Sequence, residues 1–245
     1  MPTHPLPTSS SERTAPLRAV LFGARGRMGA AIVKALQGDR AMVLHASLGR
    51  GDAPPMEGDV VLDFSSPEGS KSALAASKRL SAPLLVGTTG LPADAVEAMR
   101  AHAAVVPVMV SSNTSLGVAL LDGMVDRAAR VVGSDWRVEL EEWHHAAKRD
   151  APSGTALHLA RTARQGGATL PDSDIVAHRE GTVVGRHEIR LIGPFETLCL
   201  SHEARDRALF AHGAITLARW LCNRPAGWYT VRDWLAHRVG AAGTP

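Results

Sequence analysis

The chain has 245 residues, 45% of them hydrophobic, which is enough for one large domain or two small ones with a buried core. Its 27 lysines and arginines nearly balance 24 acidic residues, giving a net charge of +3, and no basic block alternates with aromatic residues, so we expect no nucleic-acid partner. The two cysteines lie far apart, and there is neither a signal-peptide core nor a membrane-length apolar run, so we expect a cytoplasmic protein with no membrane partner.

Residues 1–16 are rich in proline, serine and threonine and predict a disordered tail. The first predicted strand, Leu17–Phe22, runs directly into a glycine turn and an amphipathic helix that reaches about Gln37. Glycines in such a turn let a pyrophosphate approach the backbone, and the helix N-terminus then binds it. A glycine turn can also be purely structural, but its place as the first strand-to-helix turn of a series favours a dinucleotide. The predicted cofactor-binding residues here are Gly23, Ala24, Arg25, Gly26, Arg27 and Met28.

The second predicted strand, Met42–Leu48, ends at Gly49-Arg50, without the acidic residue that binds the adenosine ribose in many dinucleotide folds. Arg50 could instead pair with a 2′-phosphate, so we predict NADPH as the preferred cofactor and NADH as an alternative. The competing interpretation of Arg50 is a solvated loop residue.

Three further strands are predicted at Asp59–Phe64, Pro83–Val86 and Val105–Val110, and they alternate with helices that reach about Arg79 and begin near Pro92. This alternation predicts an α/β fold with a Rossmann-like, doubly wound parallel sheet. Ligands of such sheets bind outside the carboxyl ends of the strands, where the loops that follow them meet.

After a predicted helix at Leu116–Val132 the alternation stops, which indicates a second, smaller α+β domain with a mixed or antiparallel sheet. Its first strand, Arg137–His145, alternates so that His144 and His145 point to opposite faces, with Val138, Leu140 and Glu142 on the face of His144. Strands at Gly185–Ile192 and Phe195–His202 form a hairpin around Gly193-Pro194. We predict that residues 115–207 form this substrate-binding and oligomerisation domain, and that residues 17–114 and 208–245 form the dinucleotide-binding domain.

The stretch from His144 to Thr155 combines two histidines, a lysine and the start of a helix that continues from Ala156 to Gln165. Pro152 or Ser153 opens that helix, and Gly154 allows a ligand to approach its unpaired amides. With Lys148 just upstream, the pattern favours a carboxylate or phosphate held beside an imidazole that transfers protons. The competing interpretation is a solvated surface group.

The segment Glu142–Ala156 is similar to the signature E-x-HH-x3-K-x-DAPSGTA of 4-hydroxy-tetrahydrodipicolinate reductases, also called dihydrodipicolinate reductases. The glycine turn resembles the family's GAxGRMG cofactor loop. Two further loops match its nicotinamide-side loops, although the family more often has an aromatic residue at Thr114 and an asparagine at Ala119. The cofactor-binding residues that these loops imply are Gly87, Thr88, Thr89, Ser111, Ser112, Asn113 and Thr114.

The resemblance implies that His144 donates and accepts protons and that Lys148 is a second proton donor. The substrate-binding residues implied are His145, Lys148, Ser153, Gly154 and Thr155. It also implies NAD(P)H-dependent reduction of 4-hydroxy-tetrahydrodipicolinate to tetrahydrodipicolinate in diaminopimelate and lysine biosynthesis. A homotetramer is implied as well, although the segment before Val183 is shorter here than in the family.

The opposed histidines and the absence of a Cys/His/carboxylate spacing suited to a closed site predict an enzyme without a metal. Two alternatives remain open at this point: an NADPH-dependent reductase of another small carboxylated imine or enal, and a noncatalytic NADPH-binding sensor.

Overall fold

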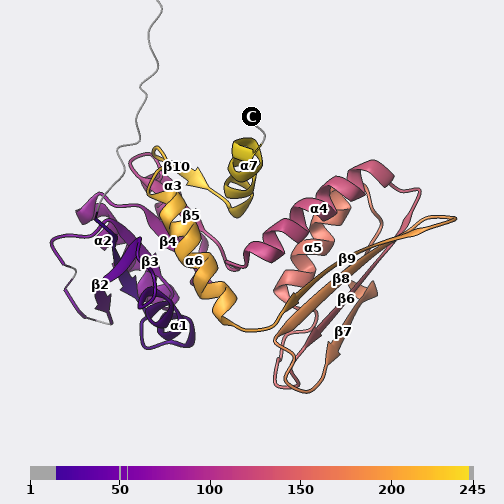
Figure 1. The fold of residues 1–245 in the computed structure, drawn as a ribbon, viewed down its shortest axis with the longest axis horizontal. Coiled ribbons are helices and arrows are strands. Elements are labelled where there is room, and N and C mark those ends of the chain that lie inside the picture. Colours follow the sequence, from indigo (N-terminus) through magenta and orange to yellow (C-terminus); the bar gives the residue numbers. More distant parts are fainter. Residues whose placement is uncertain (1–14, 50, 54, 243–245) are drawn as a thin grey trace, which may run out of the picture.

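The structure, a computed structural model, describes residues 15–49, 51–53 and 55–242 (Figure 1). Two sheets lie side by side, each with its own helices. The predicted tail, apart from its last two residues, and Arg50 lie outside the described residues.

The first sheet has six parallel strands in the order β10-β5-β4-β3-β1-β2. Its two innermost strands, β3 and β4, consist entirely of buried residues, as expected for strands covered on both faces. The predicted parallel Rossmann-like sheet is therefore confirmed. The strand bounds are β1 (Leu17–Phe22), β2 (Met42–Leu48), β3 (Val60–Asp63), β4 (Leu84–Val86), β5 (Pro107–Val110) and β10 (Gly227–Tyr229).

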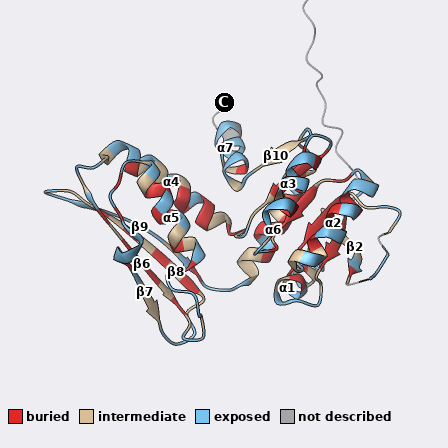
Figure 2. Ribbon diagram, turned by 180° about the vertical axis from the view of Figure 1, so that it is seen from behind, coloured by how far each residue is buried: buried red, intermediate tan, exposed pale blue. Residues whose placement is uncertain are grey.

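Helices cover both faces of this sheet, so the buried residues of the strands are enclosed between two helical layers (Figure 2). On one face α1 (Arg27–Leu36) lies against α6 (Ala208–Leu221), and their apolar residues pack on those of β1 and β3. On the other face α2 (Pro67–Leu80) and α3 (Ala93–His102) form a second apolar core. The sheet is thus doubly wound, and the loops at its strand ends are left free to bind a ligand.

The second sheet has the order β7-β6-β8-β9 and is mixed, because β6 pairs with β7 in parallel while the other pairs are antiparallel. Helices α4 (Leu116–Val132) and α5 (Gly154–Gln165) cover one face of it (Figure 1). Along β6, Val138, Leu140, Glu142 and His144 are buried in strict alternation, which confirms the predicted strand face. The strand bounds are β6 (Arg137–His144), β7 (Ile175–Arg179), β8 (Gly185–Ile192) and β9 (Thr197–Ala204).

Strand β7 and the short helix η1 (Asp172–Asp174) before it were not predicted. Only Ile175 of the five β7 residues is buried, so the segment lacks the alternation that identifies a half-buried strand. Its register with β6 places Arg179 opposite His144, which brings an arginine to the end of the signature strand.

The C-terminal segment returns to both halves of the molecule. Strand β10 completes the first sheet beside β5, and α7 (Val231–Ala242) follows it. From α7, Arg232 donates to Asp122 of α4 at 2.7 Å and to Thr162 of α5 at 3.1 Å. Along the described part of the chain, no helix has the length and apolar character needed to cross a membrane. The predicted limits of the two domains remain a prediction.

Candidate functional site

The glycine turn after β1 has the shape of a phosphate cradle. Gly23 has a φ of +86°, and a Cβ there would lie 2.3 Å from the carbonyl oxygen of Phe64, so no side chain fits. A Cβ at Gly29 would lie 2.1 Å from the Gly23 carbonyl oxygen, which shows how closely α1 approaches the turn. Gly26 caps α1 without a side-chain hydrogen bond, and the first turn of α1 has no acidic residue. The turn therefore fits a dinucleotide pyrophosphate.

The end of β2 differs from the prediction in one respect. The carboxylate of Asp52, an exposed residue, accepts a hydrogen bond from the backbone N–H of Gly49 at 2.7 Å. An acidic group therefore does lie at this strand end, supplied from three residues further along by a loop that folds back. The sequence has no acid at Gly49-Arg50 itself, and the contribution of Asp52 was not predicted.

Two of the predicted cofactor-binding threonines use their side chains to hold the fold. Thr88 accepts a hydrogen bond from the backbone N–H of Ser65 at 3.0 Å, and Thr114 donates to the carbonyl of Phe210 at 2.7 Å. Both are buried, whereas the neighbouring residues Thr89 and Ser112 are exposed at the same strand ends. The side chains of Thr88 and Thr114 thus shape the loops.

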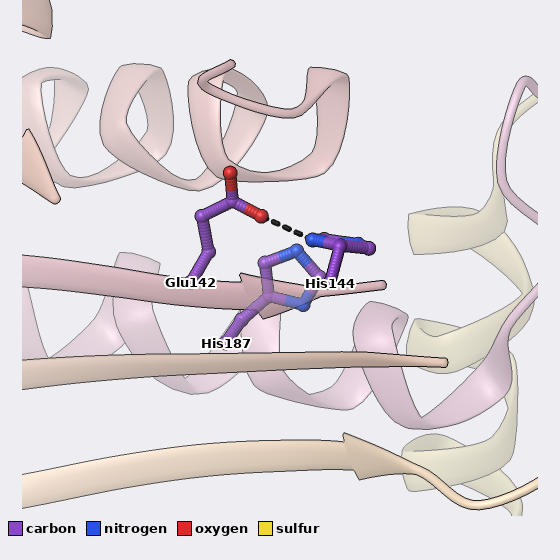
Figure 3. A group of neighbouring side chains, drawn as sticks. All are labelled: Glu142, His144 and His187. Atoms are coloured by element: carbon purple, nitrogen blue, oxygen red, sulfur yellow. Dashed lines mark ion pairs between the residues drawn. The ribbon is translucent and has the colours of Figure 1, made fainter. Parts of the chain in front are cut away.

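A fully buried carboxylate, that of Glu142, occupies the centre of the second site. One of its oxygens, Oε2, forms an ion pair with Nδ1 of His144, as Figure 3 shows. The other oxygen, Oε1, accepts from the backbone N–H of Ser153 at 3.1 Å and from Nη2 of Arg179 at 2.7 Å. Burial alone would raise the pKa of the Glu142 carboxyl, but the bonds from His144 and Arg179 outweigh it and lower that pKa to about 2. Glu142 is therefore ionised.

His187 lies on β8 directly beside this pair. Its ring meets that of His144 edge-on, with 5.2 Å between centroids, and its Nε2 lies 3.3 Å from the hydroxyl oxygen of Ser153. Burial, together with the nearby charge of His144, lowers the pKa of His187 to about 4, so its ring is neutral at neutral pH. Sequence reasoning missed His187 and Arg179. The buried alternation of β8 carries His187, but only the register that sets it opposite Glu142 brings it to the site.

Glu142, His144 and His187 offer ligand atoms that all lie within 4.8 Å of one another. A metal ion there would have to compete with a guanidinium and a backbone amide, which already hold one oxygen of Glu142. We interpret the group as an ionised carboxylate that orients an imidazole. Freedom from a metal requirement remains a prediction.

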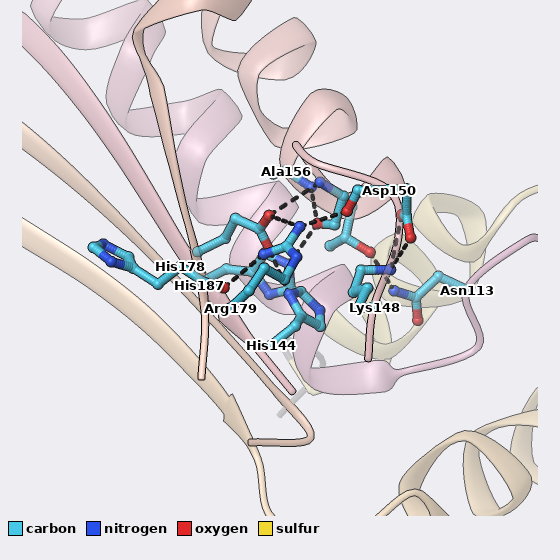
Figure 4. A network of polar contacts seen from close by, with 11 residues as sticks. Asn113, His144, Lys148, Asp150, Ala156, His178, Arg179 and His187 are labelled. Carbon is cyan, nitrogen blue, oxygen red and sulfur yellow. Dashed lines mark hydrogen bonds and ion pairs between the residues drawn. The ribbon is translucent and has the colours of Figure 1, made fainter. Parts of the chain in front are cut away.

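Lys148 lies in the loop after β6, where its Nζ contacts both carboxylate oxygens of Asp150 at 2.8 Å (Figure 4). The hydrogen bond from Lys148 lowers the pKa of the Asp150 carboxyl. Asp150 is exposed, and its backbone carbonyl accepts from Arg179. A ligand carboxylate that binds Lys148 would thus replace the exposed carboxylate of Asp150.

The start of α5 presents open backbone. Ser153 caps the helix by accepting from the backbone N–H of Ala156 at 3.2 Å, so its hydroxyl is committed to the fold, and the predicted helix opening is confirmed. Gly154 is exposed, and nothing lies within 4 Å of the position that a Cβ would take. The space in front of Gly154 is therefore free for a ligand that binds the helix amides.

Thr155 and His145 complete the predicted substrate residues. Thr155 accepts a hydrogen bond at Oγ1 from Nδ2 of Asn113 at 3.1 Å, so the loop after β5 and the start of α5 are in direct contact. His145 follows β6 and is half-buried; burial and the nearby charge of Arg207 lower its pKa. The structure thus brings His144, Lys148, Gly154 and Thr155 to one end of β6, beside a loop of the dinucleotide sheet.

Comparison with known proteins gives consistent matches. Sequence models of the N-terminus and the C-terminus of dihydrodipicolinate reductase match residues 52–114 and 117–235. The 4-hydroxy-tetrahydrodipicolinate reductase of Stenotrophomonas maltophilia strain R551-3 is 39% identical over 238 residues, which span 90% of this chain and 98% of the relative. The enzyme of the same name from Zymomonas mobilis is 36% identical, over 87% and 94% of the two chains.

Among solved structures, the dipicolinate-bound dihydrodipicolinate reductase from Paenisporosarcina sp. TG-14 superposes with a TM-score of 0.76. The two sequences are 22% identical, and the superposition covers 88% of this chain and 97% of that one. This likeness shows a shared fold.

Proposed function

The chain belongs to the dihydrodipicolinate reductase family, and from this membership we propose that it reduces 4-hydroxy-tetrahydrodipicolinate to tetrahydrodipicolinate with NAD(P)H, in diaminopimelate and lysine biosynthesis. The observation that carries the proposal is the contact between Asn113 and Thr155, because it sets the predicted nicotinamide-side loop against the predicted anion site. A reductase needs that proximity, since hydride donor and acceptor must meet.

The cofactor supplies a hydride when it is bound. The amides at the start of α1 would hold its pyrophosphate, with Gly23, Ala24, Arg25, Gly26, Arg27 and Met28 forming the turn. Gly87, Thr88 and Thr89, together with Ser111, Ser112, Asn113 and Thr114, would border the nicotinamide, and the exposed side chains of Thr89 and Ser112 are free to reach it. Arg50 favours NADPH in this proposal, while Asp52 offers a partner for the ribose hydroxyls of NADH.

The substrate is a cyclic dicarboxylate, and the site offers matching positive groups. Lys148 would hold one carboxylate after releasing Asp150, and the amides of Gly154 and Thr155 at the start of α5 would bind it as well. His145 borders the same space. These contacts orient the ring so that one face is presented to the dinucleotide sheet.

The proton steps fall to His144 and Lys148. Loss of the substrate's 4-hydroxyl as water requires a proton for the leaving group and releases one proton from the neighbouring ring carbon, and the unsaturated ring that accepts the hydride then takes up a proton at that carbon. Nδ1 of His144 faces the carboxylate of Glu142, and Lys148 offers an ammonium group in the loop that follows. Both can therefore act as acids within the site.

The test is oxidation of NADPH with freshly generated substrate, followed by mass spectrometry of the product. Turnover that depends on this substrate is the expected result. Cofactor binding without turnover would favour a noncatalytic sensor, and turnover only with a different carboxylated imine or enal would favour another reductase.

The predicted homotetramer is also part of this proposal and rests on the family resemblance. Light scattering of the purified protein tests it, and a monomer at assay concentration would contradict it. The predicted cytoplasmic location is retained as a prediction.

A further inference from the structure

The two oxygens of Glu142 face partners of different kinds. The partners of Oε1 are the backbone N–H of Ser153 and the guanidinium of Arg179, and both can only donate hydrogen bonds. Oε2 faces Nδ1 of His144, and among the described residues neither of these two atoms has any other hydrogen-bond partner. Each therefore depends on the other, inside a part of the protein that water does not reach.

An ionised carboxylate can only accept hydrogen bonds, so Nδ1 of His144 must carry a proton. From this geometry we infer that Glu142 is a positioning residue that fixes the tautomer of His144, with the proton on Nδ1 and Nε2 presented to the substrate. The inference rests on the proposed function for its catalytic meaning, but the tautomer itself can be measured without turnover. In this arrangement His144 accepts and releases the transferred proton at Nε2 alone.

The surroundings keep the imidazole in this orientation. The ring of His187 packs edge-on against that of His144, with an interplanar angle of 74°. At Gly185, on the same strand as His187, an added Cβ would lie 3.1 Å from Nε2 of His144, a tight approach, so the missing side chain leaves room beside the reacting nitrogen. Figure 3 shows Glu142 and His187 converging on His144 from two adjacent strands.

Arg179 extends the effect of Glu142 to the rest of the signature. Its Nη2 bonds both the Glu142 carboxylate and the backbone carbonyl of Asp150, the residue that holds Lys148. Glu142 thereby connects the two proposed acids, His144 through its side chain and Lys148 through the loop. The charged and titratable groups that act on this cluster are Glu142, Arg179, His187, Lys148, His145, His202 and Arg207.

The decisive variant is Glu142→Gln, because the amide is the same size and has a donor on one side. The two donors at Oε1 hold the amide oxygen on their side, so the NH₂ group faces Nδ1 of His144, which must then accept. We expect the neutral ring to change to the tautomer protonated on Nε2. Nitrogen-15 NMR of the imidazole distinguishes the two forms directly, in the full-length protein with NADPH and pyridine-2,6-dicarboxylate bound.

We expect kcat to fall by about 10²–10⁴-fold in Glu142→Gln, the usual effect of losing a general acid or base. The reason is that Nε2 of the neutral His144 ring would already carry a proton and could not accept the transferred one. KM and the dissociation constant of NADPH should stay close to the parental values. Glu142→Asp keeps a carboxylate, so it should retain the proton on Nδ1 and recover part of the lost kcat.

The matched control is Glu141→Gln, on the same strand. Glu141 pairs with His178 at 3.0 Å on the opposite face of β6, away from His144, so both kcat and the His144 tautomer should remain parental. The inference is overturned if, in the parent protein, the neutral His144 ring carries its proton on Nε2. This measurement does not depend on whether any variant folds. It is also overturned if Glu142→Gln keeps parental kcat. An inactive parent with the Nδ1 tautomer would instead contradict the proposed substrate.

Discussion

Asn113 donates a hydrogen bond from Nδ2 to Oγ1 of Thr155 at 3.1 Å, which joins the loop after β5 to the first turn of α5. Asn113 follows a strand of the first sheet, and Thr155 belongs to a helix that packs on the second sheet. The bond therefore aligns the proposed cofactor side with the proposed substrate side. A typical hydrogen bond contributes about 1 kcal/mol. Asn113→Ala should therefore lower kcat/KM about fivefold. A double-mutant cycle with Thr155→Val measures the coupling, and strictly additive effects would contradict a direct role for this bond.

Lys148 and His144 should respond differently to removal. Lys148→Ala takes away both a carboxylate partner and an acid, so KM should rise while kcat falls, whereas His144→Gln should act mainly on kcat, by about 10²–10⁴-fold. Pyridine-2,6-dicarboxylate should compete with the substrate and lose about 10–100-fold in affinity in Lys148→Ala, the value of a charge-assisted bond. Steady-state kinetics and calorimetry check both statements, and equal dicarboxylate affinity would exclude Lys148 as its partner.

Cofactor preference should depend on Arg50 and Asp52 in opposite ways. Arg50→Ala should weaken NADPH much more than NADH, because a guanidinium can pair with the 2′-phosphate. Asp52→Asn should weaken NADH and spare NADPH, since its carboxylate lies at the end of β2. Fluorescence titration gives the dissociation constant of each cofactor for each variant, to be compared with that of the parent protein. If one of these variants loses affinity equally for NADPH and NADH, the replaced residue does not determine the cofactor preference.

Chelation should leave turnover intact. One oxygen of Glu142 is held by Arg179 and by the backbone N–H of Ser153, and the other pairs with His144, so both carboxylate oxygens have partners without an ion. The measurement is kcat before and after dialysis against EDTA, with metal content checked by mass spectrometry. Loss of activity that a divalent ion restores would show that a metal is required after all.

Stability should depend on pH through His187. Its pKa is about 4 in the folded protein against a reference of 6.5, so between these values the unfolded chain binds the extra proton. The contribution of His187 to the free energy of unfolding is therefore complete above pH 6.5. It falls as the pH is lowered towards 4, by up to about 3 kcal/mol. The contribution of Glu142 has the same sign but begins to fall only near its unfolded pKa of 4.5 and is lost towards its folded pKa of about 2, so it changes little between pH 7.5 and pH 5.

Urea unfolding at pH 7.5 and pH 5 measures the effect, with His187→Gln as the comparison. The variant should be less stable at pH 7.5, since it disturbs a buried contact, but its stability should change less between the two pH values. The same pH dependence in both proteins would assign the change to other groups.

The sequence predicted those parts of the molecule that depend on local pattern. The glycine turn at Gly23–Gly29, the parallel sheet and the buried face of β6 all follow from periodicity and from the conformations that glycine allows. The signature from Glu142 to Thr155 identified the loop that carries Lys148 and the opening of α5. Each of these signals is a run of consecutive residues or a regular repetition of such runs along the chain.

The remaining parts of the site depend on strand register and on loops that fold back. Arg179 comes from a strand with one buried residue, and His187 reaches His144 only because β8 pairs with β6 in one register. Asp52 returns to Gly49 through its loop, and Thr114 turns its hydroxyl towards α6. The alternation of β8 shows only that His187 is on the buried face, and these partners are set by contacts between segments far apart in the chain, so local pattern could not have revealed them.

Strand β10 has a consequence for the order in which the molecule forms. The first sheet begins with β1 at the start of the described chain, yet it gains its edge strand and the helix α6 only from residues after 207. Strands β6 to β9 and helices α4 and α5 are contiguous in sequence, so during synthesis the second sheet has all of its parts while the first still lacks two. The half that leaves the ribosome first therefore completes its folding last, through contacts between residues far apart in the chain, which form slowly.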